Sequence, residues 1–592
     1  MERVDLVIIG AGIYGLTSAS TYHRLHPEAR ILIVEASRFI GGPWASDRSF
    51  PGLKTNNLWG MYEHPDFPMD EQTFGVKRGE HIPAEKMLEY LTAFVDWSGV
   101  RQFLKLQTRV EVIEKSGEGW TLTCVSESDE GRNKDFNIYT PKIIIAVGNH
   151  NKPLTPKYLK SSSFNPLVIH SKDFPNHFHD IVKPSTHTLI IGGSKSSWDI
   201  AYACATEPSN TSTATVLIRP SGNGPLWMTP SHVTPLTLWL EKLVFTRFFG
   251  FMSPCPWAQM SGIEGWLRSF FQGTWLGRKI TGAFWHILGE DAISLNKLDD
   301  HPETRKLRPW RSAFEIGNGL SIHNYPTNFY DLVRTGRIKI VIDEVDNLAE
   351  GKEVRLKSGD TIQADAVVYA TGWQVGNTFK FKPEGLEQEL GMPNTRPLDP
   401  EHQALIQKTE AELYKGFPFL TERDSSREHH PDPSLRYTQE KQMDQKQQPY
   451  RLHRFIAPPA ALQDRSIVFA GALLTLGTFS CAYIQSLWIT AYFDDTLSAP
   501  FSSPENIQAK VYRDTQYCVL RGPTNHGRIL PDVVFDTLPY FDLLLRDLGL
   551  QGRRKGGVLG VRECVRSYGP QDYRGLLVQW EGRRSEETKK GV

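Results

Sequence analysis

Two glycine-rich turns, each between an apolar strand and a helix, carry the residue types best suited to chemistry in this chain. The first turn reads VDLVIIGAGIYG and contains Gly10, Gly12 and Gly15. The spacing G-x-G-x-x-G after a strand is typical of a dinucleotide site, because the glycines let backbone N–H groups approach a pyrophosphate at the helix N-terminus. A second apolar strand, residues 31–34, ends in Glu35, where the partner of a ribose diol is expected. This acid suits an unphosphorylated ribose such as that of FAD.

The second turn reads TLIIGGSKSSWDIA. The strand after it, residues 215–218, ends in an arginine, which suits the 2′-phosphate of NADPH. Serines stand where glycines are commoner, so an ordinary strand–turn–helix with a small-residue loop is the alternative. The residues expected to hold the second nucleotide are Gly192, Ser194, Lys195, Ser196, Ser197 and Arg219. Together the two turns predict a flavoenzyme that NADPH reduces.

These turns require parallel sheets with a nucleotide at the carboxyl ends of the strands. We therefore predict an α/β fold of two Rossmann-like, three-layer dinucleotide-binding domains, with the NAD(P)H domain inserted in the FAD domain. The expected ranges are 1–160 and 360–500 for the FAD domain, 185–350 for the NADPH domain with an aromatic-rich, mostly helical insertion at 221–310, and 505–592 for a C-terminal extension packed on the body.

The composition excludes several other classes of protein. The 592 residues carry 67 basic and 67 acidic side chains, and this zero net charge gives no indication of nucleic-acid binding. The six cysteines are scattered without a C-x-x-C pair, so we expect no metal site and no redox disulfide, but reduced thiols of a cytoplasmic protein. The first strand begins by Val4, which leaves no room for a signal peptide.

Two apolar stretches raise the question of a membrane. Residues 466–493 contain no charged side chain and are long enough for a span, but their glycines and polar residues favour a buried strand and a buried helix. The insertion holds seven of the fifteen tryptophans, and its stretch LTLWLEKLVFTRFFGFM has helical spacing. Helices packed on the core are the plain interpretation. A wall of an apolar substrate pocket or a face that grazes a membrane is the alternative.

Four short motifs give the chain a resemblance to a known family. FNPLVIHSKDF, residues 164–174, is similar to F-x-G-x-x-x-H-x-x-x-[FY], the identifying motif of flavin-containing and Baeyer–Villiger monooxygenases, with Pro166 in place of the glycine. GGPW, KTNN before YEHPDFPM, and ATGW at 370–373 resemble further motifs of that group. Within the group, the chain most resembles the FAD-dependent monooxygenases of filamentous-fungal secondary metabolism, through KLRPW and the C-terminal PDVVFDTLPYFDLLLRDLGL.

The resemblance implies an FAD- and NADPH-dependent monooxygenase that forms a C4a-(hydro)peroxyflavin with O2 and oxygenates a small, apolar metabolite. It places Asn56 over the flavin with Asn57 as the alternative, although a turn asparagine is the plain interpretation. It makes His170 a hinge residue of the catalytic machinery, against an ordinary core histidine. It has Trp44 cover the flavin and Val110 meet the adenine. The residues expected at the FAD site are Gly10, Gly12, Tyr14, Gly15, Glu35, Gly42, Trp44, Asn56, Asn57, Val110 and Gly148.

Other functions stay open at this point. One is an NAD(P)H-dependent flavin reductase or dehydrogenase that inserts no oxygen, and another is a non-catalytic scaffold with a vestigial flavin. The motif at 164–174 favours oxygenation, and the intact glycines of the first turn argue against the scaffold. The expected partners are a small-molecule substrate and O2, without nucleic acid and without a transmembrane segment. Peripheral membrane contact has no support from the sequence alone.

Overall fold

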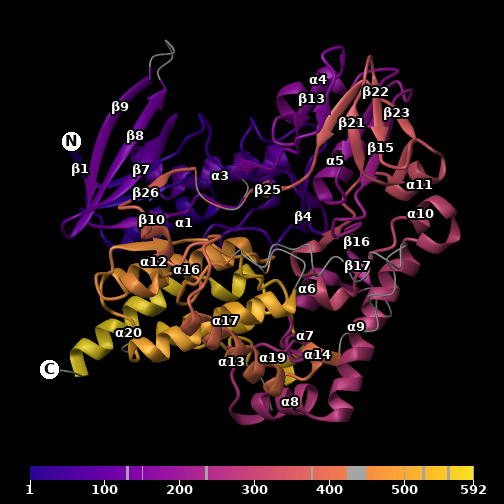
Figure 1. Ribbon diagram of the computed structural model, residues 1–592. Coiled ribbons are helices and arrows are strands. Elements are labelled where there is room, and N and C mark those ends of the chain that lie inside the picture. Colours follow the sequence, from indigo (N-terminus) through magenta and orange to yellow (C-terminus); the bar gives the residue numbers. More distant parts are fainter. Residues whose placement is uncertain are drawn as a thin grey trace.

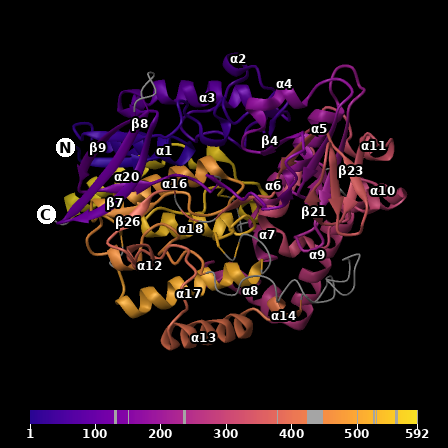
Figure 2. The ribbon, with the colours of Figure 1, turned by 45° about the horizontal axis from the view of Figure 1, so that its top comes forward.

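Two parallel five-stranded sheets lie side by side in the computed structural model, and a mostly helical layer lies below them in the view of Figure 1. The turned view in Figure 2 keeps the same separation, with the first domain on the left and the second on the right. The structure describes residues 1–127, 133–149, 151–233, 238–374, 376, 378–422, 448–498, 501–522, 527, 529–556 and 561–590.

The first sheet combines four strands from residues 6–145 with one strand from residues 467–469. Its parallel strands are, in spatial order, β27 (Ile467–Phe469), β10 (Ile143–Ile145), β2 (Leu6–Ile9), β3 (Ile31–Val34) and β6 (Leu104–Lys105). These runs of Ile, Leu and Val are expected where both faces of a parallel sheet are buried. One face packs on α1 (Ile13–Leu25) and α16 (Thr478–Phe493). The other packs on a second sheet of β1 (Glu2–Arg3), β9 (Asn133–Thr140), β8 (Gly119–Glu127), β7 (Thr108–Ser116) and β26 (Lys380–Lys382).

The second parallel sheet has the same three-layer plan. Its strands are, in spatial order, β13 (Leu167–His170), β24 (Ala366–Tyr369), β14 (His187–Ile191), β15 (Thr213–Ile218) and β20 (Ile338–Ile342). One face packs on α5 (Lys195–Ala205) and α11 (Phe329–Arg334). The other is covered by the small sheet of β12 (Leu159–Lys160), β21 (Val345–Leu348), β22 (Glu353–Leu356) and β23 (Thr361–Gln363). The predicted α/β fold with two three-layer domains is confirmed.

The strand order corrects two expected domain boundaries. The range 360–500 assigns β24 to the FAD domain, but β24 lies between β13 and β14 in the second sheet. β13 also belongs to this sheet, although it precedes the expected start at 185. Apolar runs of buried parallel strands read alike in either sheet, which is why the sequence could not assign them. The two crossings between the domains meet where β11 (Lys152–Pro153) pairs with β25 (Trp373–Gln374).

The insertion is mostly helical, as predicted. It contains β16 (Trp227–Thr229), β17 (His232–Val233), β18 (Leu238–Trp239), α6 (Leu240–Val244), α7 (Arg247–Phe251), α8 (Gly262–Gly273), α9 (Trp275–Leu295) and α10 (Pro302–Arg305), and β19 (Leu320–Ile322) follows it and pairs with β16. LTLWLEKLVFTRFFGFM does not form one helix. It breaks between α6 and α7, where the Thr246 hydroxyl accepts a hydrogen bond from the Phe249 N–H and begins a new helix.

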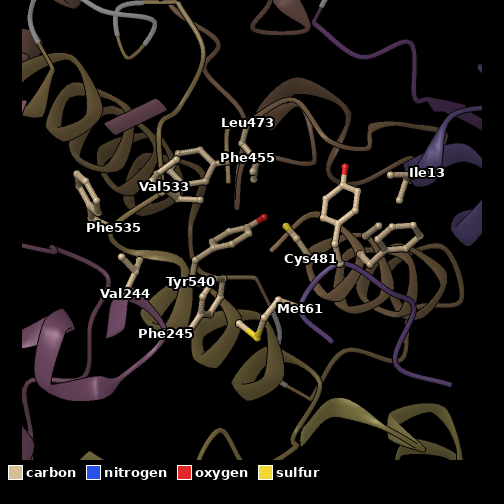
Figure 3. Packing of buried hydrophobic residues seen from close by; sticks show 14 of the residues in the cluster. Ile13, Met61, Val244, Phe245, Phe455, Leu473, Cys481, Val533, Phe535 and Tyr540 are labelled. Atoms are coloured by element: carbon tan, nitrogen blue, oxygen red, sulfur yellow. The ribbon is translucent and has the colours of Figure 1, made fainter. Parts of the chain in front are cut away.

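The C-terminal extension packs back on the body of the protein. Its helices are α17 (Pro504–Arg521), α18 (Thr537–Asp547), α19 (Val561–Val565) and α20 (Leu576–Lys590). Figure 3 shows Phe245 of the insertion and Tyr540 of the extension in one buried cluster with Met61 and Leu473 of the FAD domain. Insertion, extension and FAD domain therefore share a core.

The segment 466–493 forms the buried strand β27 and the buried helix α16, as predicted. Over the described ranges, we find no helix with the length and apolarity that a membrane crossing needs. The remaining helices and strands are β4 (Lys54–Leu58), β5 (His81–Pro83), α2 (Glu71–Phe74), α3 (Ala84–Trp97), α4 (Phe178–Ile181), α12 (Leu386–Glu389), α13 (Pro400–Gly416) and α14 (Phe419–Glu422).

Candidate active site

Two glycines of the first turn are required by the fold itself. Gly10 has φ +108°, and a Cβ there would lie 2.5 Å from the carbonyl oxygen of Ala146 at the end of β10. A Cβ on Gly15 would fall on the carbonyl oxygen of Gly10. These positions need glycine because strand and helix approach each other too closely for a side chain.

Gly12 is different, because nothing inside the protein requires a glycine there. Its φ of −83° and ψ of −174° are open to any residue, and a Cβ would meet only the Gly42 Cα, at 3.8 Å. Gly12 is the N-cap of α1, and no side chain caps this helix, whereas Thr274 caps α9 and Ser503 caps α17. A bare, uncapped helix N-terminus fits the phosphates of a nucleotide.

Glu35 lies beside this turn, one residue beyond β3. Its carboxylate accepts hydrogen bonds from the backbone N–H groups of Ala11 at 2.7 Å and Ser37 at 2.9 Å. Burial raises the pKa of Glu35, and these two hydrogen bonds oppose the rise. Each oxygen keeps a further lone pair for a ribose hydroxyl. Val110 follows close by, because the Thr108 N–H at the start of β7 donates to the Glu35 carbonyl.

The GGPW segment folds onto the glycine turn. Its residues Gly42–Trp44 form a short 3-10 helix. Gly42 lies against Gly12, because a Cβ built on Gly42 would be 3.4 Å from the Gly12 Cα. The Trp44 Nε1–H donates to the Tyr62 hydroxyl at 3.4 Å. The Tyr14 ring packs directly on Gly471, since a Cβ built on Gly471 would lie 2.6 Å from a carbon of that ring. The structure therefore brings Gly42 to the first turn, whereas Trp44 contacts Tyr62 and Tyr14 contacts Gly471.

Gly148 lies just beyond the end of β10. Its φ is +68°, and no atom lies within 4 Å of a built Cβ. The Asn151 side chain donates to the Val147 carbonyl at 2.7 Å and holds this turn. Gly148 therefore stands at the carboxyl edge of the first sheet, which is the edge where nucleotides bind.

The two asparagines of β4 have different surroundings. The Asn57 Nδ2 group donates to Glu241 Oε1 at 2.5 Å and to the Leu476 carbonyl at 3.1 Å. The Asn56 Oδ1 accepts from the Ser321 hydroxyl at 3.2 Å. Among the described residues, we find no acceptor for the Asn56 Nδ2 group. Asn57 is therefore committed to the protein, and Asn56 keeps its two amide protons for another partner.

Glu241 is the residue at this site that the sequence analysis missed. It lies in α6 with 6% of its surface exposed, and it also accepts from the Leu58 N–H at 3.3 Å. Burial raises its pKa to about 7, although the hydrogen bonds from Asn57 and Leu58 favour the carboxylate. The one signal in the sequence is a single acid within the apolar run LTLWLEKLVF.

The second turn repeats the backbone of the first with larger residues. Gly192 has φ +142°, and a Cβ there would fall on the Ala370 carbonyl. Ser194, the N-cap of α5, has φ −92° and ψ 176°, close to the values of Gly12, and no side chain caps this helix either. Ser197 is fully buried at the third glycine position, where its small side chain fits. Ser196 is exposed in the first turn of α5, and Arg219 is the first residue after β15.

Lys195 is placed differently from the other loop residues. Its ammonium donates to Asp199, to the Asn324 Oδ1 at 2.8 Å and to the Tyr325 hydroxyl at 3.3 Å, and burial lowers its pKa. Asn324 in turn donates to the Lys54 and Thr55 carbonyls at 3.0 and 3.1 Å. Lys195 thus joins the second domain to the strand of Asn56, and its side chain is already engaged.

His170 lies at the crossing between the domains. Its Nδ1 accepts from the Lys172 N–H at 3.1 Å, so its Nε2 donates to the Gly372 carbonyl at 3.0 Å. Burial lowers its pKa, which keeps the ring neutral, and the Trp373 ring packs on it edge-on at 5.1 Å. His170 therefore fastens β13 to the ATGW turn by which the chain returns to the FAD domain.

An apolar cavity lies behind β16 and β19, next to the asparagine strand. It has room for about one water molecule (≈ 10 Å³). Leu240 in its wall is adjacent to Glu241, and Leu320 is adjacent to Ser321. The lining residues are Trp227, Thr229, Leu240, Val244, Leu288, Ala313, Ile316, Leu320 and Phe535. The insertion and the extension therefore both contribute to this wall.

Comparison with known proteins gives the class. Residues 7–238 match the family model of the pyridine nucleotide-disulphide oxidoreductases. The chain is 30% identical to the FAD-dependent monooxygenase resA of Aspergillus sclerotiorum, over 97% of this chain and 98% of that protein. It is 31% identical to the FAD-dependent monooxygenase rstn6 of Aspergillus nomiae, over 98% of each. The chain belongs to this family of FAD-dependent monooxygenases, so it is a flavin-dependent enzyme and the resemblance drawn from its motifs is confirmed.

Solved structures confirm the fold. Cyclohexanone monooxygenase with bound cyclohexanone superposes with a TM-score of 0.57 at 16% identity, over 92% of this chain and 97% of that one. The cyclohexanone monooxygenase of Rhodococcus sp. Phi1, solved with NADP+, superposes with a TM-score of 0.55 at 17% identity, over 98% of each.

Proposed function

We propose that this protein uses NADPH to reduce its FAD and then transfers one oxygen atom of O2 to a small, apolar metabolite. The observation that carries the proposal is the pair of uncapped helix N-termini, one followed by Glu35 and the other by Arg219. An acid fits the ribose diol of FAD, and an arginine fits the 2′-phosphate of NADPH.

The residues of the first turn fit FAD. Gly12 leaves the backbone of α1 open to the pyrophosphate, and Glu35 accepts the ribose hydroxyls. Gly42 lies against Gly12, and β7, which carries Val110, begins with a hydrogen bond to the Glu35 carbonyl. In this arrangement Trp44 would cover the flavin and Val110 would meet the adenine. When bound, FAD accepts hydride from NADPH and activates O2.

In the second turn, the Ser194 and Ser196 hydroxyls and the backbone N–H groups of α5 would hold the NADPH phosphates. The Lys195 side chain takes no part in this arrangement, because Asp199 and Asn324 engage it. We assign it a structural role, in which it holds the second domain against β4.

Asn56 is the residue that we place at the oxygen chemistry. Its free amide protons can donate to an oxygen bound near the flavin, while Ser321 fixes the orientation of the amide. Asn57 and Glu241 hold the neighbouring backbone in place. The apolar residues behind this strand leave room for no more than about one water molecule, and such a dry wall would protect a reactive oxygen species from wasteful release.

The apolar wall next to Asn56 supports a substrate without charge, and we extend the proposal to fungal secondary metabolism on the strength of the family. We also propose a cytoplasmic location, because all six cysteines are free thiols and a reducing compartment keeps thiols in this state. A flavin reductase without oxygen insertion is the alternative.

Two experiments test the proposal. Arg219→Ala should raise the KM for NADPH at least about tenfold while leaving that for NADH almost unchanged, since a charged phosphate contact is lost. Lys339→Ala, on the exposed side of the neighbouring strand β20, is the matched control. Equal effects on both nucleotides would remove Arg219 from the phosphate site.

The second experiment supplies isotopically heavy O2 with NADPH and a panel of apolar ketones, thioethers and amines. A labelled product supports oxygen transfer and identifies its type. Oxidation of NADPH with only hydrogen peroxide formed across the whole panel would favour the reductase.

A further inference from the structure

The helical insertion carries an apolar surface that the proposed function does not use. Nine of the 17 large apolar residues that are exposed in the described part of the chain lie between 248 and 295. Scattered exposed apolar residues are ordinary, but such a concentration marks an interaction surface. The residues that we call the insertion face are Ile263, Trp266, Trp275, Leu276, Ile280 and Ile287.

The insertion face follows one side of each of two helices. In α8, Ile263 and Trp266 are three residues apart, and in α9, Leu276, Ile280 and Ile287 are spaced by four and seven. These spacings place side chains in one row along a helix. Figure 1 shows α8 at the lower end of the molecule and α9 along its right side, below the second sheet.

The opposite side of α9 packs into the protein. Trp285 and Ile293 are buried there, and Leu288 lines the apolar cavity beside β16. Trp266 and Trp275 are 67% and 68% exposed. Helices with one buried and one exposed apolar side lie along a bilayer surface rather than across it, and tryptophan is favoured at the boundary between headgroups and acyl chains.

The charges beside the two exposed tryptophans have one sign, whereas the acids Glu290 and Asp291 lie further along α9, where Glu290 pairs with Arg308. Between Phe248 and Gly289 the sole acid is Glu264, which is buried and paired with arginines. The charged side chains at the surface of α9 in this range are Arg278, which is partly exposed, and Lys279, which is exposed. Basic residues beside an apolar face fit anionic headgroups.

We propose that the insertion face docks the protein on a lipid bilayer that contains anionic headgroups. The basic residues beside the two exposed tryptophans favour an anionic bilayer as the occupant of this face. A second copy of the chain fits less well, because a two-fold contact through this face would bring the same basic residues of both copies into one apolar interface. The inference is independent of the substrate and of NADPH.

The test uses the FAD-loaded full chain in flotation with two kinds of vesicle, phosphatidylcholine alone and phosphatidylcholine with phosphatidylserine. The double variant Trp266→Gln, Trp275→Gln removes the anchors, and Arg278→Gln with Lys279→Gln removes the charge. Trp97→Gln is the matched control, because Trp97 is an exposed tryptophan of α3 outside the insertion. Flavin content and NADPH oxidation report that each variant is folded.

We expect the wild type and Trp97→Gln to float with the anionic vesicles. The tryptophan variant should lose partitioning at least about tenfold, since two large apolar anchors no longer enter the bilayer. The charge variant should bind both kinds of vesicle equally. Absence of wild-type flotation with either vesicle would overturn the proposal. So would a concentration-dependent dimer that the tryptophan variant alone abolishes, because the face would then be an interface between copies.

Discussion

At the scale of single residues, the glycines of the first turn have separate causes. Gly10 and Gly15 are glycine because a neighbouring backbone atom occupies the space of a side chain, whereas Gly12 faces no such obstacle. A glycine without an internal reason is explained by a ligand that approaches the backbone at that point. We therefore propose that Gly10 and Gly15 serve the fold and that Gly12 serves cofactor binding.

Gly12→Ala should leave the fold intact and weaken FAD binding by about tenfold or more, because a Cβ there stands between the pyrophosphate and the helix N-terminus. The ratio of flavin to protein absorbance after dialysis measures this. Gly582→Ala in α20, where a Cβ meets nothing within 4 Å, is the control. A Gly12→Ala protein that retains its full FAD content would contradict the assignment.

Glu241 should make stability depend on pH. Burial raises its folded-state pKa from 4.5 to about 7, so the folded protein binds the proton more tightly than the unfolded chain. The contribution of Glu241 to the free energy of unfolding is therefore largest below pH 4.5. This contribution falls by up to about 3 kcal/mol as the pH rises toward 7. In Glu241→Gln, the fall of the melting temperature between pH 4.5 and pH 7 that is due to Glu241 should disappear. A variant with the wild-type slope would show that Glu241 titrates normally.

The sequence was informative for residues whose roles are local. The position of Glu35 beside the Gly12 turn could be predicted because strand, turn and acid are close in the chain. The pairing of Asn57 with Glu241 could not, because 184 positions separate the two residues and only the folded insertion brings them together. The choice between Asn56 and Asn57 likewise depends on the contacts of Leu476 and Ser321.

At the scale of elements, both parallel sheets follow from apolar runs that end in small-residue turns. The assignment of each strand to a sheet does not follow, since β24 has the same composition in either place. The linkers at β11 and β25 pair with each other where the chain crosses between the two domains. The His170 side chain connects β13 with Gly372, in the segment by which the chain returns to the FAD domain.

His170→Ala should slow the reduction of the flavin by NADPH about tenfold or more, because the second domain is no longer aligned with the first. FAD content should stay unchanged. His170→Gln, which can restore a donor toward the Gly372 carbonyl, should recover part of the rate. Anaerobic rapid mixing measures the reduction. A normal rate in His170→Ala would leave His170 as an ordinary core residue.

At the scale of the whole molecule, a buried cluster of charges joins the insertion to the C-terminal extension. Arg247 of α7 pairs with Asp542 of α18 at 2.5 Å and with Glu563 of α19 at 2.8 Å. The arginine is almost fully buried. Removal of one partner from a buried pair costs about 3–5 kcal/mol, because the remaining charges are uncompensated.

Arg247→Met should therefore lower the melting temperature by about 2–4 °C, because a loss of about 3–5 kcal/mol acts against the large unfolding entropy of a chain of this length. Arg101→Met removes an exposed pair with Asp96 and should change the melting temperature by less than about 1 °C. Thermal denaturation followed by flavin fluorescence measures both. Equal, small shifts in the two variants would show that the charge cluster does not hold the extension in place.

NADPH-reduced flavin in this protein should activate O2 for transfer to a substrate. The most direct measurement reduces the enzyme with NADPH in the absence of oxygen, mixes it rapidly with oxygenated buffer and a substrate that gave a labelled product with heavy O2, and follows the flavin spectrum. We expect a transient absorbance band that differs from both oxidised and reduced flavin and decays as product forms. A direct return to oxidised flavin, with one hydrogen peroxide released per NADPH and no product, would contradict it.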